Sequence, residues 1–251
     1  MVRPLFKIAF ISLVVAALYS FTNKAYVEPS KTIVLIPYQP MMYLSDADAD
    51  IAAHSRINVR QVRSMLRNAL TERMARLLRE DFYVRSLTEA GTAEEKDDLS
   101  NFYDSESFYL SSLNSDRKLL ASDSTHFSNP FFSIFRESSA PKYSSSYMNV
   151  SLAKPALFLE LSAKYEADYF LVLTQLEIKT HYNECIDIAN RVFRREFLVH
   201  FAIFDSHGNQ QGGTAVSCEG GSDINTVGKI TYDIFPGLIG KVCGHVSATT
   251  P

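Results

Sequence analysis

The residues with the clearest chemical potential are four arginines that recur at helical spacing. They are Arg56, Arg60, Arg63 and Arg67. The intervals i, i+4, i+7 and i+11 place their side chains on one narrow strip of a helix and its entry. Guanidinium groups bind carboxylates and phosphates with paired hydrogen bonds, so this arginine stripe predicts contact with an acidic partner, a lipid headgroup or a cell-wall polymer. The alternative is a solvated face neutralised by Glu72, Glu80 and acidic loops.

The sequence has none of the common catalytic motifs: no Gly-x-Ser-x-Gly, His-Glu-x-x-His, phosphate-binding loop or Cys-x-x-Cys. Asp46, Asp48 and Asp50 imitate the start of a calcium loop. However, Ile51 stands where such a loop needs glycine, and Ile57 where it needs a bidentate glutamate. We therefore expect a solvated helix-entry loop, with no metal and no cofactor.

Two kinds of isolated reactive residue are more simply explained by the fold. His200 stands among apolar neighbours on a predicted strand, which is typical of a core or half-buried histidine. Cys185 and Cys218 have no recognisable histidine and acid beside them, so we do not expect a cysteine nucleophile.

The beginning of the chain has the pattern of an export signal. In residues 1–25, Arg3 and Lys7 precede an apolar run from Ile8 to Leu18, and small or polar residues follow. We expect a periplasmic or extracellular protein, with an uncleaved amino-terminal anchor as the alternative. The net charge of −3 gives no reason to expect nucleic-acid binding.

Residues 26–90 predict the first half of an α/β domain. The run Thr32–Tyr38 predicts a strand buried on both faces. Asn58, followed three residues later by Gln61, is a capping-box variant, and the apolar spacing after it predicts a helix to about Arg79. Residues 82–84 predict a short strand.

Residues 91–154 predict an insertion of short helices and loops, rich in serine and aromatic residues and without a sustained period. We expect some of its phenylalanines to be exposed and to form a partner site. The candidates are Phe127, Phe131, Phe132 and Phe135.

Residues 155–251 predict the second half of the domain. A helix beginning at Pro155 precedes a three-stranded antiparallel meander. Its strands are expected at Tyr169–Tyr182, Val192–Asp205 and Gln211–Ser217. Asp223 is the expected cap of a final helix that bends or ends near Pro236.

The three cysteines lie in the last third of a chain that we expect to be exported, where disulfides form. In a meander, Cys185 in the first loop and Cys218 at the exit of the third strand come to one edge of the sheet. We expect a disulfide between them if the loop folds over the middle strand, and we expect Cys243 to be free.

The predicted fold is α/β (α+β), a mixed sheet with an antiparallel meander packed by helices and one large insertion. Its order of elements resembles the amino-terminal domain of the TolB protein and related envelope lipoproteins. Three segments carry the resemblance: Thr32–Pro37, Ala167–Leu173 and Val199–Gly208. It implies a periplasmic accessory role in which the protein binds partners rather than converting substrates.

The predicted function is therefore a non-enzymatic periplasmic or envelope-associated scaffold that binds a protein partner or a cell-wall polymer, with peripheral membrane contact. One alternative is an envelope hydrolase with scattered residues such as Asp205, His207 and Glu219. The other is a glycan or small-molecule binder that stacks aromatic residues on sugar rings.

Overall fold

The first strand of the fold is buried on both faces, as its continuous apolar run predicts. The computed structural model describes residues 31–112 and 146–250. In it, β1 (Thr32–Ile36) lies between two parallel neighbours, β3 (Tyr83–Ser86) and β6 (Tyr169–Asp187). Successive side chains of β1 point to opposite faces, so it contributes to two hydrophobic layers.

The main sheet is mixed, with the strand order β3-β1-β6-β7-β8. β7 (Val192–Asp205) and β8 (Gln210–Gly221) continue from β6 as an antiparallel meander, which confirms the predicted strand order. The short β2 (Tyr43–Ser45) pairs with the distal part of β6. A second, two-stranded sheet consists of β4 (Glu106–Ser112) and β5 (Ser146–Leu152).

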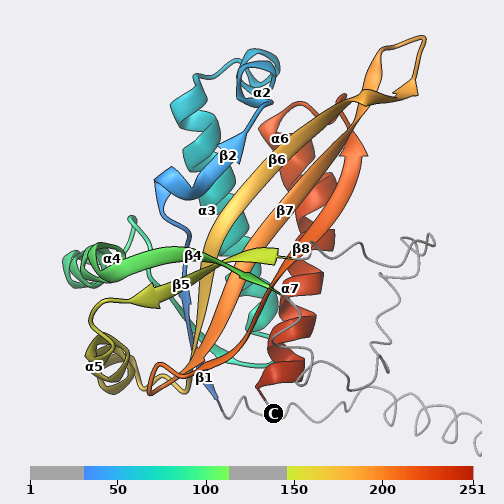
Figure 1. Ribbon diagram of the computed structural model, residues 1–251. Helices are drawn as coiled ribbons and strands as arrows, with labels where there is room; N and C mark the ends of the chain where they lie inside the picture. Colours follow the sequence, from blue (N-terminus) through green and yellow to red (C-terminus); the bar gives the residue numbers. More distant parts are fainter. Residues whose placement is uncertain (1–30, 113–145, 251) are drawn as a thin grey trace, which may run out of the picture. The chain divides into compact units, whose positions relative to one another are not determined.

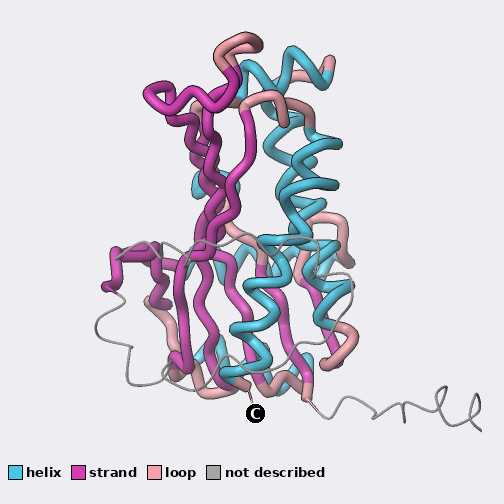
Figure 2. Tube along the Cα trace, turned by 90° about the vertical axis from the view of Figure 1, so that its right-hand side faces the viewer, coloured by secondary structure: helices cyan, strands magenta, loops and turns pink. Residues whose placement is uncertain are grey.

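Helices cover both faces of the main sheet (Figures 1 and 2). One face packs against α2 (Asp48–Ser55), α3 (Val59–Leu78) and α7 (Phe235–Thr249). The other packs against α4 (Ala93–Ser105), α5 (Ala156–Tyr165) and the β4–β5 ribbon. The α/β fold class is thereby confirmed.

The long helix α3 begins where its capping signal predicts. The Asn58 side chain accepts from the Gln61 amide, and the Gln61 side chain accepts from the Asn58 amide, which closes the capping box. Its apolar stripe, which includes Val62, Leu66 and Leu70, is fully buried against the sheet. The helix ends at Leu78, one residue before the predicted end.

The predicted insertion of short helices and loops contains a helix in its described part, but it also contains two strands that the sequence did not predict. Residues 93–105 form α4, which has its own capping box between Thr92 and Glu95. β4 and β5 pair over seven residues each. Only a few apolar side chains of α4, such as Leu99 and Phe102, are buried, so the hydrophobic period is too sparse to read. The four phenylalanines lie outside the described residues. They are Phe127, Phe131, Phe132 and Phe135.

The final helical segment begins differently from the prediction. Thr226, rather than Asp223, caps the short α6 (Val227–Lys229), since its hydroxyl accepts from the Lys229 amide. A π-helical turn, Ile230–Ile234, follows and leads into α7. Pro236 lies in the first turn of α7, directly after this π-helical turn. Within the described residues, no helix is both long and apolar enough to cross a membrane.

The predicted disulfide between Cys185 and Cys218 is not formed, and all three cysteines are free thiols. β6 continues as a strand through Cys185, which pairs with Phe193, instead of folding back over β7. Cys218 pairs with Phe197, on the other side of β7. Four residues along β7 and two strand spacings separate the two thiols, about 13 Å and about 10 Å respectively. Both displacements exceed the reach of a disulfide.

The three thiols should therefore differ in reactivity. Cys185 is exposed, whereas burial raises the pKa of Cys218 and raises that of Cys243 to about 12. Because the thiolate is the reactive form, an aromatic disulfide reagent should label Cys185 first and Cys243 only on unfolding. Mass spectrometry of labelled peptides measures the order. A mass increase of the unlabelled protein upon reduction would instead reveal a disulfide.

Candidate binding cleft

A cleft lies at the edge of the sheet where the connections between strands switch from one face to the other. From β1 the chain passes along one face through α2 and α3 to β3, and then along the other face through α4 and α5 to β6. β1 and β3 are neighbouring strands, and the loops that follow them lead to opposite faces of the sheet, so these loops diverge at the carboxyl ends of the two strands. In wound α/β sheets this divergence leaves a crevice where ligands commonly bind.

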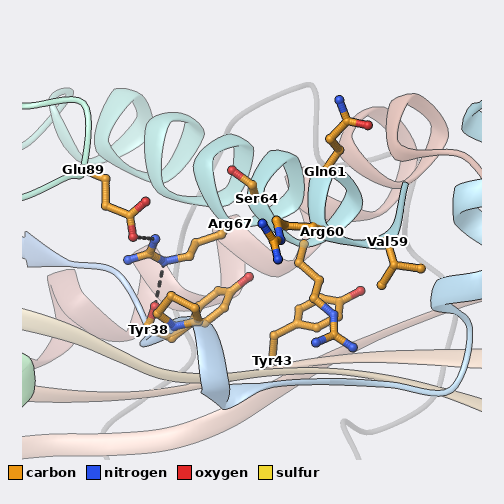
Figure 3. A pocket seen from close by; sticks show the side chains of 10 residues that line it. Tyr38, Tyr43, Val59, Arg60, Gln61, Ser64, Arg67 and Glu89 are labelled. Carbon is orange, nitrogen blue, oxygen red and sulfur yellow. Dashed lines mark hydrogen bonds and ion pairs between the residues drawn. The ribbon is translucent and has the colours of Figure 1, made fainter. Parts of the chain in front are cut away.

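A cleft of about 670 Å³ occupies this position. Tyr38 and Pro40 follow β1, Glu89 follows β3, and Tyr43 belongs to β2. The opposite wall is the amino-terminal half of α3 (Figure 3). This half contributes Val59, Arg60, Gln61, Arg63, Ser64 and Arg67.

Arg67 forms the closed end of the cleft and is only 5% exposed. Its Nε donates to the Tyr38 carbonyl at 2.8 Å, Nη1 to Glu89 at 2.7 Å and Nη2 to the Tyr103 hydroxyl at 2.6 Å. Tyr103 in turn donates to the carbonyl of Pro37 at 2.7 Å. One guanidinium therefore joins the loops after β1 and β3 to α4, and each of its three nitrogens already donates one hydrogen bond. Its role is to hold the cleft together.

Arg63 contacts residues of α2 and β2. Its Nε donates to Asp48 at 2.8 Å, and its guanidinium carbon lies 5.6 Å from the centre of the Tyr43 ring. The Tyr43 hydroxyl donates to the other oxygen of Asp48 at 2.7 Å. Burial and the nearby Asp48 carboxylate raise the pKa of Tyr43 well above its ordinary value. This phenol is therefore a neutral donor.

Arg60 is exposed and lines the cleft. Figure 3 shows its side chain extending from α3 toward Tyr43. Across residues 31–112 and 146–250, no acidic side chain forms an ion pair with it. Its guanidinium is thus available to a ligand.

Tyr38 adds a second unused group to the same cleft. The residue is 1% exposed, and its buried hydroxyl has no hydrogen-bond partner among the described residues. A buried hydroxyl without a partner costs free energy, so a molecule that reached it would recover a hydrogen bond. Figure 3 shows this hydroxyl on the side of the ring that faces α3.

The structure divides the predicted arginine stripe into three roles. Arg67, which is buried, and Arg63, whose side chain is 51% exposed, pair with Glu89 and Asp48 rather than with Glu72 or Glu80. Arg60 faces the cleft. Arg56 is exposed and lies outside the cleft lining, since it ends α2 in a left-handed conformation with φ of 57°.

Sequence reasoning missed the residues that complete the cleft. Tyr43 and Glu89 lie in segments that show no periodic pattern, and Tyr38 is the last residue of the predicted strand Thr32–Tyr38. The position of these residues in the sequence could have indicated the cleft. Polar or aromatic residues directly after a buried parallel strand lie at the edge of the sheet where ligands bind.

The three alternating aspartates face separate partners. Asp46 accepts from the Thr180 amide and hydroxyl, and Asp50 lies 3.2 Å from Arg195. Asp48 holds Arg63 and Tyr43, as described above. Each carboxylate therefore fixes a different contact of the α2 region, and they do not converge on one point.

The residues suggested for a hydrolase are also far apart. Asp205 and His207 lie in the β7–β8 turn, where the Asp205 carboxylate accepts from the backbone amides of His207 and Asn209. Glu219 lies near the far end of β8 and pairs with Arg194 at 2.7 Å. The nine residue steps along β8 from Gln210 to Glu219 span about 30 Å, so these groups do not form one site.

Comparison with known proteins gives no family. No protein-family model matches the chain, and no curated protein matches its sequence. Among solved structures, the chain is similar to the hypothetical protein CT253 from Chlamydia trachomatis, with 11% identity and a TM-score of 0.40 over 87% of this chain and 98% of that one.

Two crystal forms of the PelC dodecamer from Paraburkholderia phytofirmans are also similar. Their identities are 9% and 12%, with TM-scores of 0.30 and 0.29. The matches cover 87% and 86% of this chain and 91% and 88% of PelC. At these values the likeness concerns the fold alone, and the resemblance to the TolB domain stays a prediction.

Proposed function

We propose that this protein is a non-enzymatic, envelope-associated accessory protein that binds an anionic group of a protein partner in the cleft between α3 and the loop after β1. The leader-like residues 1–25 support the envelope location. The missing catalytic motifs and the resemblance to the TolB domain support an accessory role.

The observation that carries the proposal is the unpaired Arg60 in a cleft whose other cations are already neutralised. A guanidinium with five donors in a fixed fork suits a carboxylate or a phosphate. Tyr38, Pro40, Tyr43 and Val59 supply apolar walls. The combination suits an acidic group carried on a partly apolar segment.

Reversing the charge of Arg60 tests this function. We expect Arg60→Glu to reduce capture of the partner from the envelope fraction by about tenfold or more, because it places a carboxylate where the ligand's anion would bind. The measurement is quantitative pull-down at low and moderate salt. Binding by the unmodified protein should weaken as salt rises.

Arg76→Glu is the matched control, since Arg76 is exposed on the same helix but outside the cleft. Both variants should melt within a few degrees of the unmodified protein. Equal loss of binding in both variants, or none in Arg60→Glu, would contradict the proposal.

A further inference from the structure

A separate feature concerns the way the β4–β5 ribbon is attached to the main sheet. In Figure 1 the ribbon crosses in front of β6 and β7, and β5 packs against β6, β7 and β8. Much of this contact is polar and buried, unlike the apolar layers around it. Asn149 is 2% exposed, Thr174 is fully buried and His200 is 5% exposed.

Two side chains of the sheet bind the backbone of one ribbon residue, Met148. Its amide donates to Nδ1 of His200 at 3.0 Å, and its carbonyl accepts from the Thr174 hydroxyl at 2.6 Å. Thr174 is the extra residue of a β-bulge, since Leu173 pairs with Phe201 and Gln175 with His200. The bulge therefore places the two side chains next to each other under the ribbon.

This geometry determines the protonation state of the imidazole. Because an amide donates to Nδ1, this nitrogen must carry a lone pair, so the ring proton is on Nε2. Nε2 lies 3.1 Å from an oxygen of Glu177. The His200 side chain is the largest cause that lowers the pKa of Glu177, to about 2, so this carboxylate remains charged at mildly acidic pH.

We propose that His200 is an acid-sensitive latch that helps to hold the β4–β5 ribbon against the sheet and loosens this contact when Nδ1 takes up a proton. A protonated Nδ1 is a donor and faces the amide of Met148, which is also a donor. The hydrogen bond is then lost and replaced by repulsion. The carboxylate of Glu177, 3.1 Å from Nε2, remains charged beside the ring.

Few charged groups of the described residues surround the latch. On β6 they are Glu177 and its partner Lys179, and further along β7 Glu196 faces His181 at 3.5 Å. On the ribbon the nearby titratable groups are the phenols of Tyr109 and Tyr147, which bond to Asn149. On β8 the residue opposite His200 is Ala215. Among these groups, His200 is the one whose side chain contacts Met148 directly.

Hydrogen exchange followed by mass spectrometry tests the latch on the full chain. We expect the protection factors of amides 147–150 to fall about fivefold or more between pH 7.5 and pH 5.5, as loss of one net hydrogen bond implies. Protection of α3 should stay constant. In His200→Asn, whose side-chain oxygen can accept from Met148 but does not titrate, ribbon protection should be the same at both pH values.

Three results would overturn the latch: unchanged ribbon protection in the unmodified protein, an equal fall in His200→Asn, or a fall shared by the whole fold. If His200→Asn does not fold, nitrogen NMR of the unmodified protein decides. A Met148 amide signal that shifts together with Nδ1 protonation supports the latch, and one that does not shift refutes it.

Discussion

Replacing Arg67 by leucine should destabilise the protein by about 2–4 kcal/mol. The leucine would fill part of the space but leave the Tyr38 carbonyl and the Tyr103 hydroxyl without their donor. The lost pair with Glu89 adds little, since that carboxylate is 64% exposed. For a domain of this size, the loss corresponds to a fall of about 10 °C in melting temperature.

Urea denaturation of the variant measures this effect. Arg67→Lys should be intermediate, because an ammonium group keeps the charge but cannot reach all three partners in a plane. Arg60→Leu on the same helix should change stability by less than about 0.5 kcal/mol, since that side chain is exposed. Similar stability of the Arg67 and Arg60 variants would show that Arg67 does not hold the cleft together.

Replacing Glu106 by glutamine should remove a pH-dependent loss of stability. Glu106 begins β4 and accepts from the Gln39 side chain at 2.6 Å, and burial raises its pKa from 4.5 to about 8. The folded state therefore keeps a proton that the unfolded state releases above about pH 4.5. Its contribution is fully present below that pH and is lost as pH rises through about 8.

Glutamine is neutral at every pH and can accept the same hydrogen bond. We therefore expect Glu106→Gln to match the unmodified protein at about pH 4.5 and to exceed its free energy of unfolding by about 3 kcal/mol at about pH 9. Urea denaturation of both proteins across this range measures the difference. A difference that does not depend on pH would show that Glu106 ionises as readily in the folded state as in the unfolded one.

The sequence predicted those elements whose residues carry a complete local signal. The buried run of β1, the capping box of α3 and the alternating strands of the meander each combine a period with an end signal. It failed for α4 and for β4 and β5, whose buried faces consist of few apolar residues. The prediction of a disulfide failed for another reason. Its geometry depended on a loop at Cys185 that is instead a strand.

The candidate cleft was only partly predictable. Helical spacing placed the arginines on one side of α3, but it could not show that Asp48 and Glu89 neutralise two of them. Those pairs depend on how α2 and the loop after β3 fold back onto α3, which is a tertiary property. The remaining cation, Arg60, is distinguished from its neighbours only by that packing.

The most direct test of the central claim is photo-crosslinking from within the cleft. A photoreactive amino acid at Ser64, which is exposed on the cleft wall, should form an adduct with the partner from the envelope fraction. The same group at Arg76 should not, and Arg60→Glu should abolish the Ser64 adduct. An adduct that forms equally at both positions, or that persists in Arg60→Glu, would show that the partner binds elsewhere.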